Sequence, residues 1–146
     1  MRKSRYLYAA GVVLAVCMVF GWEFVTAAQT GQNEQPSRLA VLWTSADADV
    51  ARNVCFMYTH AAKKQKWFDE VKLIVWGPSA RLLAGDKDLQ EQVKQMIADG
   101  VILQACVMCA DRYGASEALR KLGIEVRGMG KPLTEILKSD WKVLTF

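Results

Sequence analysis

The sequence contains a single histidine and only four cysteines, so it offers few residues for a metal site. Cys106 and Cys109 form one C-x-x-C pair, and a four-ligand zinc site would also need Cys55 and His60. Those two residues fall on one expected helix, five positions apart, and therefore point in different directions. The sequence thus predicts no metal site, and we expect Cys55 to be a core thiol and His60 a surface helix residue.

The chain also lacks a strong excess of positive charge. Its formal net charge is +4, but three Lys or Arg residues and one Glu precede Gln29. From Gln29 onward there are 16 basic and 14 acidic residues, a net charge of +2. No stripe of Lys and Arg interleaved with aromatic residues occurs, so no nucleic-acid partner is expected. No glycine-rich loop follows the first strand-like run either, so no flavin, nucleotide or other cofactor is expected.

The longest uncharged apolar run is short, because it covers only the 16 residues from 7 to 22. A membrane-spanning helix needs about 20. Basic residues precede this run and the small residues at 26–28 follow it, which is typical of a secretory signal peptide. We expect an exported, periplasmic protein in which residues 1–28 are cleaved off or remain as a membrane anchor. Residues 29–37 then form a linker and residues 38–146 the domain.

Beyond the linker, strand-like apolar runs alternate with segments of helical pattern, without repeats or low-complexity tracts. Strands are predicted at 39–43, 71–76, 101–105, 124–126 and 141–146, and helices at about 47–66, 89–98, 110–122 and 132–139, with a short helix after Ser79. This alternation indicates a single α/β domain. We expect a mostly parallel five-stranded sheet with helices on both faces, as in flavodoxin-like topology.

The two cysteines of the C-x-x-C pair fall where the third predicted strand gives way to a helix. Cys106 is expected at the carboxyl edge of the sheet and Cys109 in the first turn of the helix, where the helix dipole favours a thiolate. Three interpretations follow. Cys106 carries sulfur as a persulfide with Cys109 as its partner thiol, or the pair cycles between dithiol and disulfide. In the third, both are structural, in a non-enzymatic oligomeric module that binds a small ligand or a protein.

Polar residues in neighbouring loops are candidates for binding a substrate beside Cys106. Ser45 and Ser79 follow the first two predicted strands, together with Asp47 and Arg81, and carboxyl ends of parallel strands share one edge. Arg112 lies one turn beyond the cysteine pair and could hold an anionic sulfur species. The alternatives are helix capping for the serines and a solvated helix position for Arg112.

The segment at 103–114, LQACVMCADRYG, resembles the DsrE/DsrF-like family, in which an apolar strand ends in a cysteine followed by small residues, an Arg and a Gly. The first strand and its loop, LAVLWTSADAD, and the closing half, GIEVRGMGKPLTEILKSDWKVLTF, are also similar to that family. The resemblance covers residues 39–146. It implies a flavodoxin-like α/β subunit.

The same resemblance implies trimers or hexamers and a role in sulfur relay with donor or acceptor proteins. It matches Cys106 to the sulfur-accepting position. Cys109 stands where many sulfur-carrying members have a small residue, which keeps both sulfur relay and dithiol redox chemistry open. The predicted export signal is a second departure, since an oxidising compartment favours a disulfide.

Overall fold

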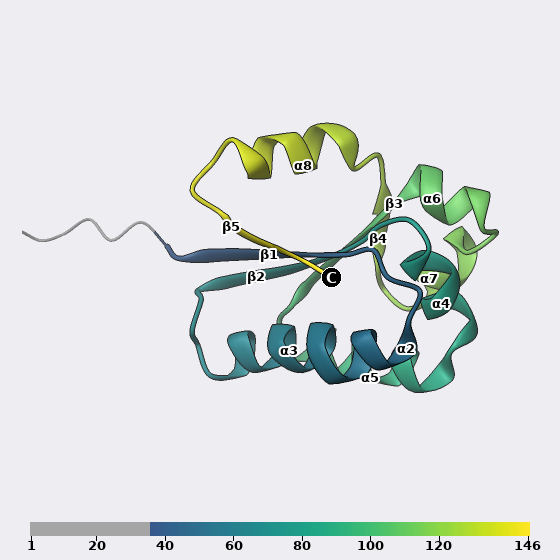
Figure 1. Cartoon of the computed structure of the whole chain (residues 1–146), viewed down its shortest axis with the longest axis horizontal. Helices are drawn as coiled ribbons and strands as arrows, with labels where there is room; N and C mark the ends of the chain where they lie inside the picture. Colours follow the sequence, from purple (N-terminus) through teal and green to yellow (C-terminus); the bar gives the residue numbers. More distant parts are fainter. Residues whose placement is uncertain (1–35) are drawn as a thin grey trace, which may run out of the picture. The chain divides into compact units, whose positions relative to one another are not determined.

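The computed structural model describes residues 36–146, so the predicted export signal and most of the linker lie outside the described residues. Five parallel strands form one sheet in the order β4-β3-β2-β1-β5 (Figure 1). Their bounds are β1 Arg38–Trp43, β2 Glu70–Val75, β3 Ile102–Cys106, β4 Glu125–Arg127 and β5 Lys142–Thr145. Strands β1 to β4 thus lie side by side in chain order, and β5 pairs with the other edge of β1.

The helices cover the two faces of the sheet unequally. The main face is covered by six helices: α2 Ala48–Val50, η1 Ala51–Phe56, α3 Met57–Lys64, α4 Ser79–Gly85, α5 Lys87–Ala98 and α7 Ser116–Lys121. Of these, η1 is a π-helix. The opposite face carries α8 (Gly130–Leu137), and α6 (Val107–Arg112) follows the carboxyl end of β3 (Figure 1). Several helices therefore cover one face of the sheet, and α8 alone packs on the other.

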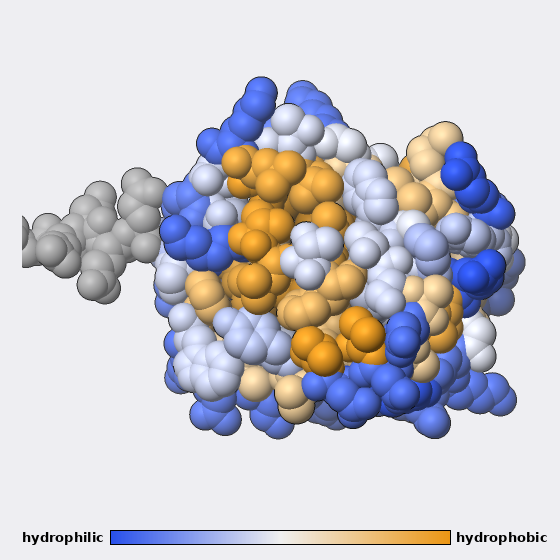
Figure 2. Space-filling view, in the orientation of Figure 1, coloured by the Kyte–Doolittle hydropathy of each residue, from blue (hydrophilic) through white to orange (hydrophobic). Residues whose placement is uncertain are grey.

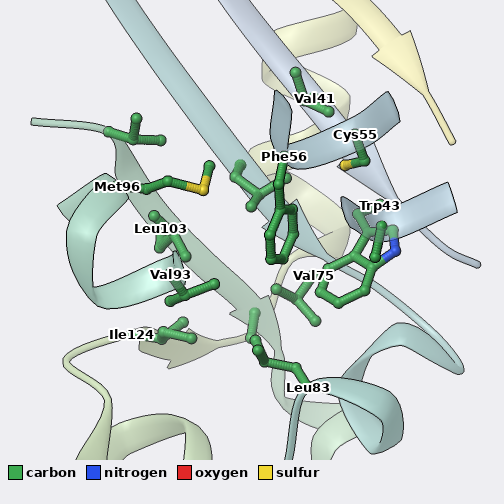
Figure 3. Close-up of a cluster of buried hydrophobic side chains, with 14 of the residues drawn as sticks. Val41, Trp43, Cys55, Phe56, Val75, Leu83, Val93, Met96, Leu103 and Ile124 are labelled. Atoms are coloured by element: carbon green, nitrogen blue, oxygen red, sulfur yellow. The ribbon is translucent and has the colours of Figure 1, made fainter. Parts of the chain in front are cut away.

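The central strands are apolar because both of their faces are buried. In β1, Leu39, Val41 and Trp43 face the larger core, while Ala40 and Leu42 face the smaller cluster under α8. Trp43 contacts Phe56 of η1 edge to face, with ring centroids 4.9 Å apart (Figure 3). Helix α5 adds to this core through apolar residues at helical spacing.

Cys55 is a core thiol, as the sequence predicts. It is 0 % exposed and lies beside Trp43 in the larger core (Figure 3). Burial raises the pKa of its thiol to about 12, although a hydrogen bond with Thr59 acts in the opposite direction. Cys55 is therefore protonated and unreactive at neutral pH.

The predicted fold class is confirmed: the chain forms a single α/β domain with a five-stranded parallel sheet and helices on both faces. One helix prediction is wrong, because residues 110–122 do not form a continuous helix. The chain turns between α6 and α7, where Gly114 has a φ of +63° and Ala115 N–H donates to the Ala110 carbonyl at 2.7 Å. Within residues 36–146, none of the helices combines the length and apolar character needed to cross a membrane.

Candidate functional site

Cys106 lies where the sequence predicts it, at the carboxyl end of β3. It is the last residue of the strand and the N-cap residue of α6, with extended backbone angles. Its side chain is 5 % exposed and belongs to the smaller apolar cluster, with Ala40, Ile74, Met129 and Ile136. The thiol is thus at the expected edge of the sheet but is largely shielded from water.

Cys109 is the more accessible member of the pair. It lies half-buried in α6 and packs against the cluster that contains Cys106. A helix N-terminus predicts a lowered thiol pKa, but the pKa of Cys109 lies above its ordinary value. Burial and the neighbouring Cys106 thiol raise it, and they outweigh the Gly77 backbone amide and the Arg112 charge, which lower it. Cys109 thus packs against the same apolar cluster as Cys106, and it is a neutral thiol at pH 7.

We expect alkylation by iodoacetamide to rank the thiols by exposure and pKa. In the native protein Cys109 reacts first, while Cys55 reacts only after unfolding, because it is 0 % exposed with a pKa of about 12. The rate at Cys109 keeps rising up to pH 9.0, the ordinary pKa of the thiol, because the pKa of Cys109 is higher. Mass spectrometry of peptides measures both effects, and a plateau of the Cys109 rate near pH 7 would contradict the raised pKa.

Of the predicted neighbours Arg112 and Ser45, the structure places Arg112 near the pair. Arg112 is exposed in the last turn of α6 and lowers the pKa of Cys109 through its charge. Ser45 follows β1 and its Oγ accepts a hydrogen bond from the Asp47 N–H at 3.0 Å. Asp47 in turn caps α2 by accepting from the backbone N–H groups of the first turn. The structure thus brings Arg112 to the pair and gives Ser45 and Asp47 local turn and capping contacts.

Ser79 is fully engaged in holding β1 and β2 together. It is 0 % exposed, and its hydroxyl contacts the Trp43 carbonyl at 2.7 Å and the Trp76 carbonyl at 3.0 Å. The Trp76 N–H also donates to its Oγ at 3.2 Å. Because backbone groups use the whole hydroxyl, Ser79 shapes the loop that carries Gly77 instead of offering a free group to a substrate.

Arg127 is a neighbour of Cys106 that the sequence reasoning missed. It ends β4 and is the cross-strand partner of Cys106 in the parallel register of β3 and β4. Its Nη1 lies 3.1 Å from Glu125 Oε1, and its side chain is exposed. A signal existed in the sequence, because Arg127 directly follows the predicted strand at 124–126, at the edge where Cys106 lies.

The described residues show no cluster of three or more His, Cys, Asp or Glu side chains that could hold a metal ion. His60 pairs with Asp99, with Nε2 and Oδ2 2.5 Å apart, and not with a cysteine. This contact holds the pKa of the Asp99 carboxyl below its ordinary value. His60 therefore ties α3 to the end of α5.

Comparisons with known proteins agree with this architecture. A family model described as the DsrE/DsrF-like family matches residues 37–146. The solved structure of a conserved protein of unknown function from Bacteroides thetaiotaomicron, BT1422, is 35% identical, with a TM-score of 0.73 over 75% of this chain and 95% of that chain. The crystal structure of the YchN protein from E. coli is 20% identical, with a TM-score of 0.60 over 75% of this chain and 99% of that chain, which shows a shared fold. No curated protein matches this chain.

Proposed function

This chain belongs to the DsrE/DsrF-like family, and from that premise we propose that it relays sulfane sulfur as a persulfide on Cys106, with Cys109 as the partner thiol. The observation that carries the proposal is that Cys106 and Cys109 share one apolar cluster at the carboxyl edge of the sheet. A single buried cysteine could be structural. A second, half-buried thiol packed against the same cluster supplies a route for sulfur in or out.

The proposed chemistry has two steps. The Cys106 thiolate attacks the outer sulfur of a donor R–S–S⁻, so that a new S–S bond forms on Cys106 and R–S⁻ leaves with the electron pair of the broken S–S bond. Delivery follows either by attack of an acceptor thiolate on the outer sulfur or by attack of Cys109 on the inner sulfur. The second route releases HS⁻ and leaves a Cys106–Cys109 disulfide.

The burial of Cys106 supports a carrier more than a fast-turnover nucleophile. A persulfide reacts readily with dissolved oxidants and thiols, and a 5 % exposed position among apolar side chains slows the access of these reagents. Arg112 and the Gly77 amide offer positive potential on the open side, toward Cys109. These features favour holding one sulfur atom until a specific partner reaches the pair.

A dithiol oxidoreductase is the second candidate function, and the packing of both thiols against one cluster favours it. A C-x-x-C pair at the start of a helix can close a disulfide with the loss of two hydrogens to an oxidant. An exported chain, as the first 28 residues predict, would meet such oxidants. The two candidates differ in the mass change of the protein, which separates them experimentally.

We also propose that the protein acts as a homo-oligomer, a trimer or hexamer, through an apolar band over α8 and β5. Figure 2 shows apolar residues gathered on this side of the molecule. Leu137 of α8 is 62% exposed, and Leu144 of the edge strand β5 is 38% exposed. An exposed apolar band beside an unpaired strand edge favours a contact with a second copy.

Replacing Leu137 and Leu144 by lysine is expected to convert the oligomer into monomers, because two charges would have to be buried in the contact. Light scattering coupled to gel filtration measures the mass. Met108→Lys is the control, since Met108 is 70% exposed on α6, which follows β3 and is not part of α8 or β5. A monomeric wild-type protein, or an oligomer that survives both lysines, would contradict this interface.

A further inference from the structure

A hollow of about 370 Å³ lies on the sparsely covered face of the sheet, next to the cysteine site. Its floor is formed by Lys72 of β2, Gln104 of β3 and Arg127 of β4, which come from three adjacent strands. Its roof includes Glu135 of α8, and Trp141 closes one side. This volume is in the range of small-molecule sites.

Gln104 shows that the hollow is prepared for a hydrogen-bond donor. Its side chain is 7% exposed, and its Nε2 donates to Glu125 Oε2 at 2.5 Å. Its Oε1 is buried and has no partner within the described part of the chain. Turning the amide over would place this oxygen against a carboxylate, so the orientation is determined by Glu125. Since buried acceptors are normally paired, Oε1 needs an N–H or O–H from a ligand.

The charges around the hollow have both signs. Lys72 Nζ lies 4.7 Å from the centroid of the Trp141 ring and forms no ion pair with any residue in 36–146. Arg127 adds a second cation, which Glu125 contacts at 3.1 Å. Glu135 contributes a carboxylate that meets only Lys131, at 3.8 Å. A ligand with one anionic and one cationic group fits this arrangement better than a simple anion.

The hollow is also adjacent to Cys106. Arg127 is the cross-strand partner of Cys106, so the two residues are neighbours on the same face of the sheet. Cys106 belongs to one apolar cluster with Ile136 and Trp141, and both of these line the hollow. A molecule bound there therefore lies against the apolar cluster that contains the buried thiol.

We propose that this hollow binds a small zwitterionic α-amino acid that carries the sulfane sulfur, a hydropersulfide of the cysteine type. Its carboxylate pairs with Lys72 and Arg127, its ammonium group donates to Gln104 Oε1 and Glu135, and its carbon chain packs against Trp141. The inference deepens the proposed relay by naming its donor. In the transfer, the Cys106 thiolate attacks the outer sulfur of R–S–SH, Cys106–S–SH forms, and R–S⁻ leaves, so no oxidant or reductant is consumed.

Calorimetric titration with S-methylcysteine tests binding apart from transfer, because this probe has the charged groups but no transferable sulfur. We expect saturable binding to the wild type and to Cys106→Ser alike. Arg127→Gln and Lys72→Gln should each weaken binding at least about tenfold, the loss of a charge-assisted contact. Lys121→Gln, which removes an exposed cation paired with Glu117 on α7, should leave binding unchanged.

Several outcomes would overturn the inference. The first is no binding of S-methylcysteine, and the second is binding by Arg127→Gln and Lys72→Gln as tight as that of the wild type. The third is binding of thiosulfate as tight as that of S-methylcysteine, which would indicate a site for simple anions. Failure of the relay is distinguishable from failure of this site. Sulfur loading from polysulfide without S-methylcysteine binding removes only the donor assignment, whereas binding without any sulfur loading retains the amino-acid site and removes the relay.

Discussion

Replacing Cys106 by serine is expected to abolish sulfur loading. The purified, reduced wild-type protein, exposed to polysulfide or thiosulfate, should gain the mass of one sulfur atom, and Cys106→Ser should remain at the mass of its untreated control. The reason is chemical, because a serine hydroxyl stays protonated at neutral pH and cannot accept sulfane sulfur. Intact-mass spectrometry measures the gain, and peptide mapping places it on Cys106.

Cys109→Ser supplies the matched control for this experiment. If Cys109 is the partner thiol, this variant still gains the sulfur and retains it longer, because the internal attack that releases HS⁻ is lost. A gain that survives Cys106→Ser and disappears in Cys109→Ser would contradict the assignment of Cys106. A loss of two hydrogens that needs both thiols would support the dithiol oxidoreductase, and no mass change in any variant would support a binding module.

The fold could be predicted from the sequence because each strand is an apolar run of the right length between turn residues. β1 contains the apolar run LAVLW and β2 the apolar run LIV, both largely buried, and such runs are typical of parallel strands. The break between α6 and α7 could not be predicted in the same way. Residues on both sides of Gly114 suit a helix, and only packing of α7 onto the larger core decides where the chain turns.

The site was predictable in position but not in environment. The strand-to-helix change located Cys106 and Cys109, yet burial of Cys106 under α8 depends on a helix that follows 24 residues or more later in the chain. The direction of the Cys109 pKa depends on that same burial. Ser79 and Arg127 show the limit most clearly, because their partners come from other strands and no local pattern records such contacts.

The π-helical segment η1 contributes to stability, since Phe56 packs against Trp43 of β1 in the larger core. Phe56→Ala is expected to destabilise the protein by about 3 to 5 kcal/mol, through lost burial and a cavity beside Trp43. Phe56 is 2% exposed, and its ring meets Trp43 at an interplanar angle of 77°. Urea denaturation followed by circular dichroism gives the free energy of unfolding, which is only about 5 to 15 kcal/mol for an ordinary domain.

The adjacent residue offers the control for that prediction. Met57 is 63% exposed, so Met57→Ala should change the free energy of unfolding by no more than about 0.5 kcal/mol. Phe56 belongs to the larger core and Cys106 to the smaller cluster, so folded Phe56→Ala should load sulfur on Cys106 as the wild type does. Equal stability of the two variants would contradict the packing of η1 on β1. Loss of loading in fully folded Phe56→Ala would show instead that η1 positions the thiol pair.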